Sequence, residues 1–319
     1  MRTVQTSHPV PLASVKPLEG LRPYRDFCLA ATREALQGET QPFTRSPVTG
    51  ASLEPYGEIE GVPYARCPVS GSVFLARRPE PAAWAHLLGE ASRFRHAPGA
   101  FHAGLAQSRT DYVYAPKVEW IEDALRLQEV RRPVILEAAS GPSEFSKFLR
   151  DSAAFAEVLT VEETALAAGA APRRPVQAAV LFESLDRAHD PERLLRGVAE
   201  RLAGGGLLFV TGLVCSGFDL AVLGLRNRYL YPPDRANCFS LQGLLRLLER
   251  YGFTPLEVST PGMLDVEIVQ SHLAQDPTLA LSPFERRLLQ ADQQTQEAFQ
   301  AFLQAQGLSS FARIVARHA

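Results

Sequence analysis

Short apolar runs alternate with amphipathic segments through the second half of the chain. The runs at residues 134–137, 157–162 and 176–182 are brief and rich in Val, Leu and Ala, which is typical of strands in a parallel sheet. Residues 143–150 and 191–202 instead repeat apolar side chains at three- and four-residue steps, as amphipathic helices do. This alternation predicts an α/β fold with a Rossmann-like, doubly wound, mostly parallel sheet.

The C-terminal part continues the pattern. The glycines at 204–206 precede a strand-like run at 207–211, and Gly252 ends a predicted helix at 241–251. The remaining predicted elements are a strand near 256–259, one long helix at 283–306 and a final strand at 311–316. Because a helix precedes this final strand, we expect the strand to be inserted at the end of the sheet, in an antiparallel direction.

One connection in this region is unusually short. Only 13 residues, 164–176, lie between the second predicted strand and the next recognisable one. A helix, a strand and a second helix do not fit in that length, since a crossover between parallel strands alone takes about a dozen residues. We therefore expect one strand of a full doubly wound sheet to be trimmed or missing here.

The N-terminal part has a different character. Residues 1–80 are rich in Pro, Gly, Ser and Arg, and they contain the near-repeat Ser46-Pro-Val-Thr-Gly and Cys67-Pro-Val-Ser-Gly, which predicts two similar tight turns on short hairpins. Residues 81–132 have helical periodicity and predict a helical connector or lid. The expected organisation is a small N-terminal module at 1–80, this lid, and an α/β domain at 133–319.

The composition of the chain limits which classes of binding partner are expected. Hydrophobic residues make up 46% of the chain and charged residues 21%, so a sizeable core can form. The net charge of -2 gives no basic footprint for nucleic acid, and a small molecule or a protein is the expected partner. The four cysteines have no paired spacing, which favours a reduced, cytoplasmic setting. No apolar run approaches the length of about 20 residues that a membrane helix needs.

Candidate binding residues gather where the predicted strands end. In an open parallel sheet, ligands bind at the carboxyl ends of the strands, where backbone amides and a nearby acid can hold a nucleotide-like group. Three segments meet this description: the glycine-containing turn at 136–143, Glu162 or Glu163 after the second strand, and residues 182–191 after the third. Glu162 is the better candidate of the two acids, because the alternation of its strand continues to it.

The order and spacing of these segments resemble the class I S-adenosylmethionine-dependent methyltransferases, in particular the branch related to ubiquinone and sugar-pathway enzymes, over roughly residues 110–319. Asp190-Pro191 matches the family's "Asp-Pro" directly, whereas Ala139 and Ser143 stand where two of three loop glycines are usual. The resemblance implies S-adenosylmethionine as the cofactor. It implies as cofactor-binding residues Glu137, Ala139, Gly141, Glu162, Phe182 and Glu183.

The resemblance also implies an acceptor side. His189 follows the third recognisable strand and is the candidate for removing a proton from the acceptor, although such a histidine more often caps or packs. The other candidates on this side are Asp186, Arg187, Tyr229, Tyr231 and Arg235. Arg235 would suit an anionic substrate, and loop packing is the alternative role for the two tyrosines.

The two N-terminal turns resemble a zinc ribbon, whose turns read Cys-Pro-x-Cys-Gly. We place Ser46, Val48 and Val69 at three of the four ligand positions, with only Cys67 retained. A tetrahedral zinc site needs four thiolate or imidazole ligands, so this degenerate module is expected to bind no metal.

Two functions from different classes remain. The first is an enzyme that transfers a methyl group from S-adenosylmethionine to an oxygen, nitrogen or carbon atom of a small molecule in a biosynthetic pathway. The second is a catalytically inactive, methyltransferase-like binding or scaffold subunit, which the lost glycines, the trimmed strand and the emptied zinc ribbon favour. A nicotinamide-dependent oxidoreductase is disfavoured because the turn lacks G-x-G-x-x-G. The helix at 284–302 is expected to pack in the core or to form a surface for a second copy of the chain.

Overall fold

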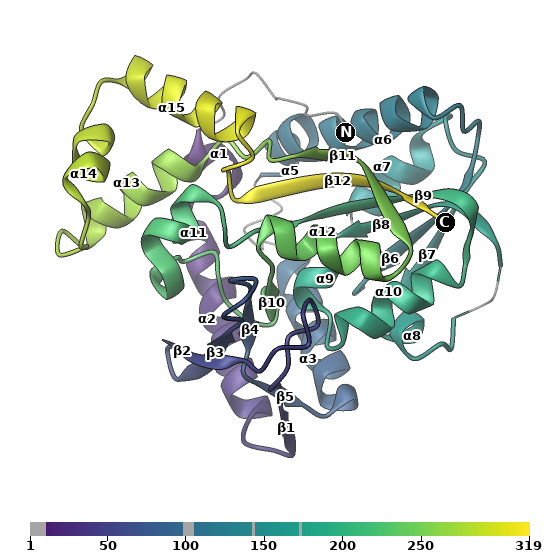
Figure 1. Ribbon diagram of the computed structural model, residues 1–319, viewed down its shortest axis with the longest axis horizontal. Helices are drawn as coiled ribbons and strands as arrows, with labels where there is room; N and C mark the ends of the chain where they lie inside the picture. The colour runs from purple at the N-terminus through teal and green to yellow at the C-terminus, as the bar shows by residue number, and fades with distance from the viewer. Residues whose placement is uncertain (1–10, 98–104, 142–143, 172–173) are drawn as a thin grey trace.

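The largest sheet of the described residues has six strands. It forms the centre of the α/β part of the molecule (Figure 1). The computed structural model describes residues 11–97, 105–141, 144–171 and 174–319. The strand order is β11-β12-β9-β8-β6-β7, in which only β12 runs against the others. The strands span β6 Val134–Ala139, β7 Glu157–Glu162, β8 Val176–Phe182, β9 Leu202–Leu213, β11 Phe253–Ser259 and β12 Phe311–His318. The predicted α/β class and the antiparallel direction of the final strand are confirmed. That strand is not at the end of the sheet, because β12 is inserted between β9 and the edge strand β11.

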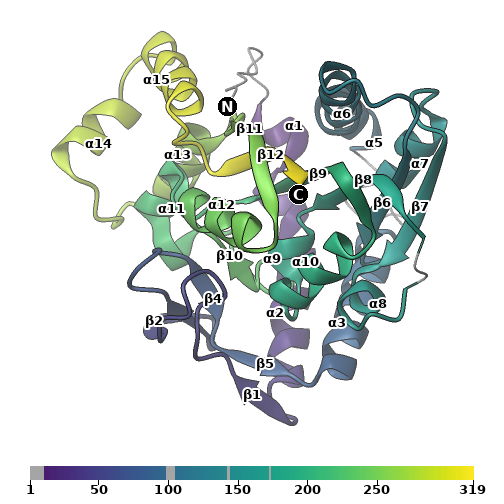
Figure 2. The same ribbon diagram turned by 45° about the vertical axis from the view of Figure 1, so that its right-hand side comes forward.

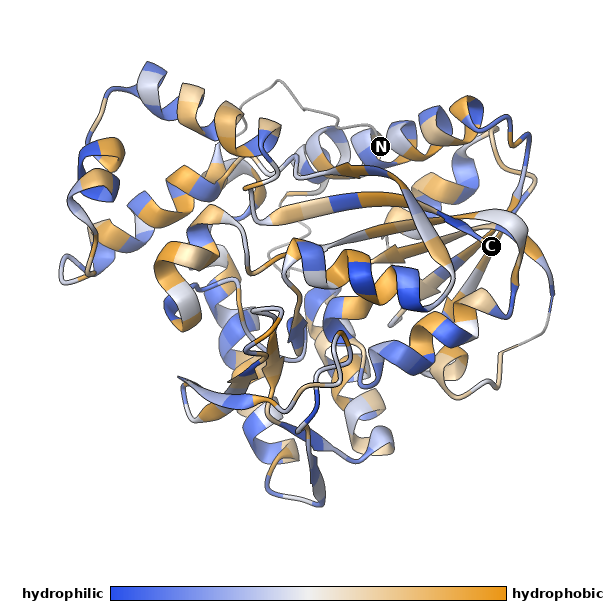
Figure 3. Cartoon of the chain, in the orientation of Figure 1, coloured by the Kyte–Doolittle hydropathy of each residue, from blue (hydrophilic) through white to orange (hydrophobic). Residues whose placement is uncertain are grey.

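Helices cover both faces of this sheet. One face carries α6 (Ala115–Leu127) and α7 (Glu144–Asp151), and the other carries α8 (Glu163–Ala167), α10 (Pro191–Ala199) and α12 (Leu241–Arg250). Neighbouring strand residues alternate between the two layers, so that Ile135 packs among the first group and Leu136 among the second. Figure 3 shows the corresponding apolar strands between helices with polar outer sides.

The predicted helix starts follow ordinary capping chemistry. The Asp190 side chain accepts a hydrogen bond from the backbone N–H of Arg193, and Pro191 occupies the first helical position of α10. The Ser240 hydroxyl accepts from Gly243 in the same way at the start of α12. These two residues fix where the chain leaves the carboxyl edge of the sheet.

The short connection after β7 has the predicted consequence. Between β7 and β8 the described residues contain only the one-turn-and-a-half helix α8, and β7 is the edge of the sheet. The edge of the sheet beside Glu162 is therefore formed by β7, as the short connection predicts.

The predicted long helix at 283–306 is wrong. Two helices, α14 (Pro283–Leu289) and α15 (Gln293–Ala305), occupy this range, because the Asp292 side chain caps the backbone N–H of Thr295 and starts a second helix. A further helix, α13 (Asp265–Gln275), was not predicted. Together these three helices project from the sheet at its β11 and β12 side (Figure 1).

The N-terminal part begins with helices that the sequence pattern did not reveal. They are α1 (Leu12–Val15) and α2 (Leu18–Ala35), the second with Pro23 inside it. The short strands that follow form two small sheets: β1 (Thr40–Pro42) with β5 (Arg77–Pro79), and β2 (Glu54–Ile59), β3 (Val62–Arg66) and β4 (Val73–Leu75) with β10 (Asn237–Cys238). Because β10 lies far along the chain, the N-terminal strands are joined directly to the larger part (Figure 2). The boundaries at residues 80 and 132 stay a prediction.

The lid region is helical as predicted. It contains α3 (Pro81–Arg95), α5 (Ala106–Arg109) and a π-helical turn, η1 (Thr110–Tyr114), that continues into α6. Helix α3 packs on α2 through Trp84, Leu87 and Leu88. Among the residues that the structure describes, no helix has the length and apolar character needed to cross a membrane.

The two Pro-Val-Ser/Thr-Gly turns have the same backbone form and face each other. In each, the glycine N–H donates to the carbonyl of the first residue at 2.8 Å. Thr49 Oγ1 lies 3.4 Å from Cys67 Sγ, and the Ser70 backbone N–H donates to the same sulfur. Burial by itself raises the pKa of the Cys67 thiol, but hydrogen bonds with Ser46, Ser70 and Thr49 together outweigh it and lower the pKa to about 6.

This geometry corrects the residues assigned to the ligand positions. The Val48 side chain is buried in the core and that of Val69 is 63% exposed, so the two valines point to different surroundings. The first and fourth residues of each turn gather instead, namely Ser46 and Thr49 with Cys67 and Ser70. The predicted placement at the valines is wrong, because the second cysteine of Cys-Pro-x-Cys-Gly is the fourth residue, which is Thr49 in one turn and Ser70 in the other.

We expect the purified wild-type protein to contain no stoichiometric zinc, because only one of these four positions supplies a thiol. The variant Ser46→Cys/Thr49→Cys/Ser70→Cys should bind one zinc ion per chain, since its three new cysteines and Cys67 together supply four sulfur ligands. Elemental analysis after extensive dialysis measures both. Adding Cys67→Ser to the triple variant is the control and should remove the metal. A folded triple variant without zinc would contradict the proposed zinc-ribbon origin of the turns.

Candidate functional site

Three adjoining cavities follow the carboxyl edge of the parallel strands. The loop cavity, of about 420 Å³, rests on residues 138–141 at the end of β6 and is walled by α3 and by Phe182 and Glu183 at the end of β8. The Glu162 cavity, of about 830 Å³, shares the turn after β6 with it. The Tyr229 cavity, of about 220 Å³, shares Glu183 with the loop cavity and lies on its other side. Candidates from three strand ends are thus brought to one groove.

The turn after β6 needs its single described glycine. Gly141 has φ of 142°, in the region that favours glycine, and a Cβ there would lie 2.6 Å from Ser92 Oγ on α3. Ala139 is buried at the end of β6, in register with Glu162 of β7. Ser143 lies outside the described residues. Helix α3 therefore presses on the predicted cofactor loop, a contact that the sequence did not indicate.

Glu137 ties this turn to its neighbours. Its carboxylate accepts a hydrogen bond from Ser146 Oγ of α7 at 2.8 Å and from Thr160 Oγ1 of β7 at 3.0 Å. Burial raises the pKa of Glu137, and these two hydrogen bonds act in the opposite direction. The residue also lines the loop cavity, so it holds the turn and faces the site at once.

The two adjacent acids after β7 have different roles. The Glu163 carboxylate is buried and is held by the Arg187 guanidinium, whose Nε and Nη2 donate to it at 2.8 to 3.1 Å. Glu162 is exposed, lines its cavity, and makes no hydrogen bond or ion pair with the residues described. Partial burial and the neighbouring Glu163 charge raise the pKa of Glu162. Glu162 is therefore the acid that remains available to a ligand.

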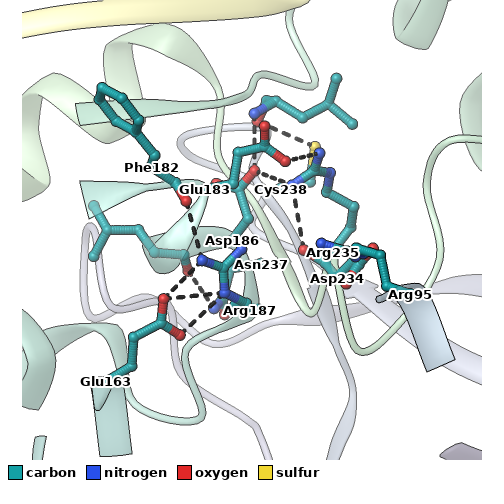
Figure 4. Close-up of polar contacts among 12 residues, drawn as sticks. Arg95, Glu163, Phe182, Glu183, Asp186, Arg187, Asp234, Arg235, Asn237 and Cys238 are labelled. Carbon is teal, nitrogen blue, oxygen red and sulfur yellow. Dashed lines mark hydrogen bonds and ion pairs between the residues drawn. The ribbon is translucent and has the colours of Figure 1, made fainter. Parts of the chain in front are cut away.

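A buried charge cluster lies where β8 ends (Figure 4). Glu183 has a left-handed backbone with φ of 59°, and its carboxylate accepts from Arg235 Nη2 at 2.6 Å. Asp186, on the short helix α9 (Ser184–Arg187), accepts from Arg235 Nη1 at 2.8 Å and from the backbone N–H of Leu213 at 2.9 Å. Burial alone would raise the pKa of Glu183, but Arg235, Lys117 and Lys16 hold it well below its usual range.

The predicted acceptor-side residues divide into two groups. Tyr229, Tyr231 and Arg235 line the Tyr229 cavity, and Arg187 lines the loop cavity. Asp186 lines none of the three cavities, because it is turned into the core to bind Arg235 and Leu213. The Arg235 guanidinium is ion-paired with both Glu183 and Asp186. Its predicted role in binding an anionic substrate is therefore not supported.

His189 lies away from the groove. Its Nε2 is 2.8 Å from the Pro79 carbonyl oxygen, and its ring packs edge-on against Trp84 at 6.0 Å. It lines none of the three cavities. The structure thus places this predicted catalytic residue in the packing between β5 and α3, and we assign it no catalytic role.

The N-terminal part supplies residues that sequence reasoning missed. The Tyr229 hydroxyl donates to the Lys16 carbonyl at 2.7 Å, and Tyr231 packs edge-on against Tyr24 of α2. Lys117 of α6 lies at the junction of two cavities, 3.9 Å from Glu183. The only sequence signal was rarity, since Lys16 and Lys117 are two of the three lysines in the chain.

Comparison with known families agrees with this arrangement. Residues 111–258, a little under half of the chain, match the family described as "Methyltransferase domain". The matched segment thus resembles a methyltransferase domain. It covers the strands β6 to β9, the loop after β6 and the charge cluster, and it ends within β11. No curated protein matches the chain.

Solved structures of low sequence identity also match. A 1,6-didemethyltoxoflavin-N1-methyltransferase of Burkholderia thailandensis is 14% identical, with 83% of this chain and 99% of that chain covered and a TM-score of 0.42. A putative sarcosine dimethylglycine methyltransferase of Galdieria sulphuraria is 13% identical, with 64% and 85% covered and a TM-score of 0.38. At TM-scores below 0.5, neither likeness indicates an activity.

We predict that Lys117→Met raises the free energy of unfolding at pH 7. Burial lowers the pKa of Lys117 from 10.5 to about 8. The folded protein thus binds this proton less tightly than the unfolded chain. The free energy of unfolding is therefore lowest below about pH 8, where Lys117 is charged in both states. It rises as the pH increases from about 8 to 10.5, where the unfolded chain still holds the proton and the folded protein has lost it. Removing the charge should stabilise the protein at pH 7 by about 1 to 3 kcal/mol.

Urea unfolding of both proteins at pH 7 and pH 10.5 measures this effect. The stability difference between wild type and Lys117→Met should shrink at the higher pH. Lys147→Met is the matched control, because Lys147 is exposed on α7 and should change stability little at either pH. A Lys117→Met protein that is less stable than wild type at pH 7 would show that the cation is needed for folding.

Proposed function

We propose that this protein transfers a methyl group from S-adenosylmethionine to an oxygen, nitrogen or carbon atom of a small molecule. The observation that carries the proposal is the run of three adjoining cavities at the carboxyl edge of the sheet, with the middle one resting on the turn after β6. The match of residues 111–258 to a methyltransferase domain supports it. Such a row offers space for a long cofactor beside a separate, smaller acceptor.

The residues present fit the cofactor. Ala139 and Gly141 would approach its methionine part with their backbone, and Glu162, which has no partner among the described residues, would accept hydrogen bonds from the ribose hydroxyls. Phe182 and Glu183 would border the methyl-transfer position, at the junction of the loop and Tyr229 cavities. When bound, S-adenosylmethionine supplies a methyl group that its sulfonium has already activated.

The chain's own contribution is then mainly alignment. Holding the acceptor in line with the methyl group converts a bimolecular step into an effectively unimolecular one. The Arg235 contacts with Glu183 and Asp186 would fix the wall between the loop cavity and the Tyr229 cavity. Tyr229 and Tyr231 would form part of the acceptor side, since both line the Tyr229 cavity. A small molecule suits the Tyr229 cavity, whose volume is about 220 Å³.

The finer parts of the assignment are proposals of the same kind. We propose that the protein acts in biosynthesis in the cytoplasm, where its four cysteines, all free thiols, would stay reduced. We propose also that the chain derives from the branch of ubiquinone and sugar-pathway methyltransferases, with a degenerate zinc ribbon in residues 1–80. The paired turns around Cys67 support that origin.

One observation favours the second candidate, an inactive binding or scaffold subunit. Ser92 of α3 lies close to Gly141, on the face of the turn that the cofactor would approach, and Ala139 replaces a usual glycine. Cofactor affinity separates the candidates, because an active enzyme must bind S-adenosylmethionine in this conformation or after a shift of α3.

We predict that Glu162→Gln weakens binding of S-adenosylhomocysteine by about 1 to 3 kcal/mol, the scale for losing hydrogen bonds to a charged group. Glu163→Gln should behave differently. It leaves the buried Arg187 without its carboxylate and should lower the free energy of unfolding by about 3 kcal/mol or more. Titration calorimetry measures binding, and urea unfolding measures stability.

The pair is internally controlled, since both variants remove one negative charge from adjacent positions. Loss of affinity in Glu163→Gln but not in Glu162→Gln would move the ribose role by one residue. No detectable cofactor binding in folded wild type would overturn the proposed methyl transfer and leave the scaffold function ahead.

A further inference from the structure

The chain is poor in lysine, and its lysines are not distributed like surface residues. It contains three lysines against thirty arginines. Two of the three, Lys16 after α1 and Lys117 on α6, line the Tyr229 cavity. Lys117 is only 7% exposed. Lysine is rarely buried without a partner because its charge loses hydration, so two at one small cavity call for a function.

Neither ammonium group is fully neutralised by the protein. Lys117 Nζ is 3.9 Å from a Glu183 oxygen, but the same carboxylate is bound more closely by Arg235 at 2.6 Å. Otherwise Lys117 lies over the faces of two aromatic rings, Phe182 at 4.8 Å and Phe311 at 5.6 Å. Lys16 Nζ lies over the Tyr229 ring at 5.4 Å and forms no ion pair within the described part of the chain.

The remaining acids of this cavity are already engaged. Asp234 pairs with Arg95 and accepts from Tyr24. Asp219 accepts from the Leu220 N–H and from Asn227, and burial together with Asp265 raises the pKa of Asp219 to about 7. Asp265 itself accepts from the Ser309 hydroxyl and the Ser310 N–H. None of these three carboxylates forms an ion pair with a lysine in the described part of the chain, although the Asp219 charge raises the pKa of Lys16 and partly offsets its burial.

Further positive charge lies close by. Arg109 and Arg313 also line the cavity, and the buried Nε of Arg313 has no hydrogen-bond partner among the described residues. Burial lowers the pKa of Lys16, and burial with the nearby cations keeps the pKa of Lys117 near 8 despite Glu183. The residues outside the described ranges, 1–10, 98–104, 142–143 and 172–173, include no Asp or Glu, and the one acid whose side chain alone is not described is Glu144, at the start of α7. The chain therefore offers no further carboxylate from these segments.

We propose that the acceptor bound in the Tyr229 cavity carries an anionic group, a carboxylate or a phosphate, that lies between Lys16 and Lys117. This inference rests on the proposed methyl transfer, since it names the class of acceptor. The other walls, Tyr112, Val113, Tyr229, Met263 and Phe311, are mostly apolar or aromatic. They fit a small acid with a ring or short carbon skeleton in a volume of about 220 Å³.

The methionine carboxylate of the cofactor is the other source of such an anion. Lys117 lines both the loop cavity and the Tyr229 cavity, so either molecule can approach it. Lys16 lines only the Tyr229 cavity of these two. An acceptor anion must therefore affect both lysines. A cofactor carboxylate in the loop cavity, which Lys117 and Lys147 line, would leave Lys16 unaffected.

The small number of lysines makes a direct test practical. Protein labelled with ¹³C at the lysine side chain should give three assignable NMR signals, identified with Lys16→Met, Lys117→Met and Lys147→Met. Benzoate, phenyl phosphate and the neutral benzamide serve as probes, each titrated to roughly 20 mM, enough for a dissociation constant near 1 mM. We expect at least one of the two anions to shift the Lys16 and Lys117 signals saturably, with Lys147 unchanged and benzamide without effect.

A second measurement uses the variants. Lys117→Met and Lys16→Met should each weaken binding of the responding anion by about tenfold or more, since each removes one of two paired cations. Arg246→Met is the control, because it removes one positive charge from an exposed position on α12 that lines none of the cavities. The pKa of Lys117 should also rise when the anion binds.

Three outcomes would overturn the proposal: no saturable shift with either anion, equal shifts with benzamide, or shifts of both lysines by S-adenosylhomocysteine alone that block the anion's effect. The last would assign the cations to the cofactor. Failure of the underlying methyl transfer is detected separately, as absent binding of S-adenosylhomocysteine to wild type. If wild type binds the anion but not S-adenosylhomocysteine, the two lysines form an anion site that is not an acceptor site for methyl transfer, and the proposal is wrong.

Discussion

The ion-paired cluster of Glu183, Asp186 and Arg235 is the constraint on which the site depends. Charged groups held away from water are costly unless each is hydrogen-bonded. Here Asp186 and Arg235 are largely buried and Glu183 is partly exposed; the two carboxylates share one guanidinium, and Asp186 also accepts from the Leu213 N–H. The close approach leaves no room for a side chain at Gly212, where a Cβ would lie 2.6 Å from Asp186. The cluster thereby fixes the end of β8, the end of β9 and the segment around Arg235 relative to one another (Figure 4).

That fixed segment connects the two ends of the chain. Directly after Arg235, Asn237 donates from its side chain to the carbonyls of Leu185 and Ala188 and pairs in β10 with Phe74 of β4. The N-terminal sheet is therefore held against the charge cluster. As a result, α2 and the residues after α1 form part of the Tyr229 cavity, which residues 111–258 would not enclose alone.

Two neighbouring acids illustrate how burial separates binding from structure. Glu162 and Glu163 have the same side chain and follow the same strand, yet Glu163 is turned inward and held by Arg187 while Glu162 faces a cavity. A buried carboxylate with a bidentate arginine has little left to offer a ligand, whereas an exposed one keeps its acceptor capacity. The same distinction applies to the cations. Arg235 is paired closely with two carboxylates, whereas Lys117 is 3.9 Å from one of them and Lys16 forms no ion pair with the described residues.

The sequence by itself determined the sheet and the ends of its strands. The apolar runs at 134–137, 157–162 and 176–182 are local signals, and the residues after them must meet at one edge because parallel strands share a direction. The helix caps at Asp190 and Ser240 are local as well, as is the short connection that leaves β7 at the edge.

Only the tertiary structure decided what else faces the groove. The contact of Ser92 with Gly141, the His189 contact with Pro79 and the placement of Lys16 beside Tyr229 each join residues far apart in the chain. No periodicity or motif encodes such contacts, because they depend on how α1, α2 and α3 pack over the sheet. The residues that hold the turn could therefore be predicted from the sequence. The charges that distinguish one acceptor from another arise only when the chain is folded.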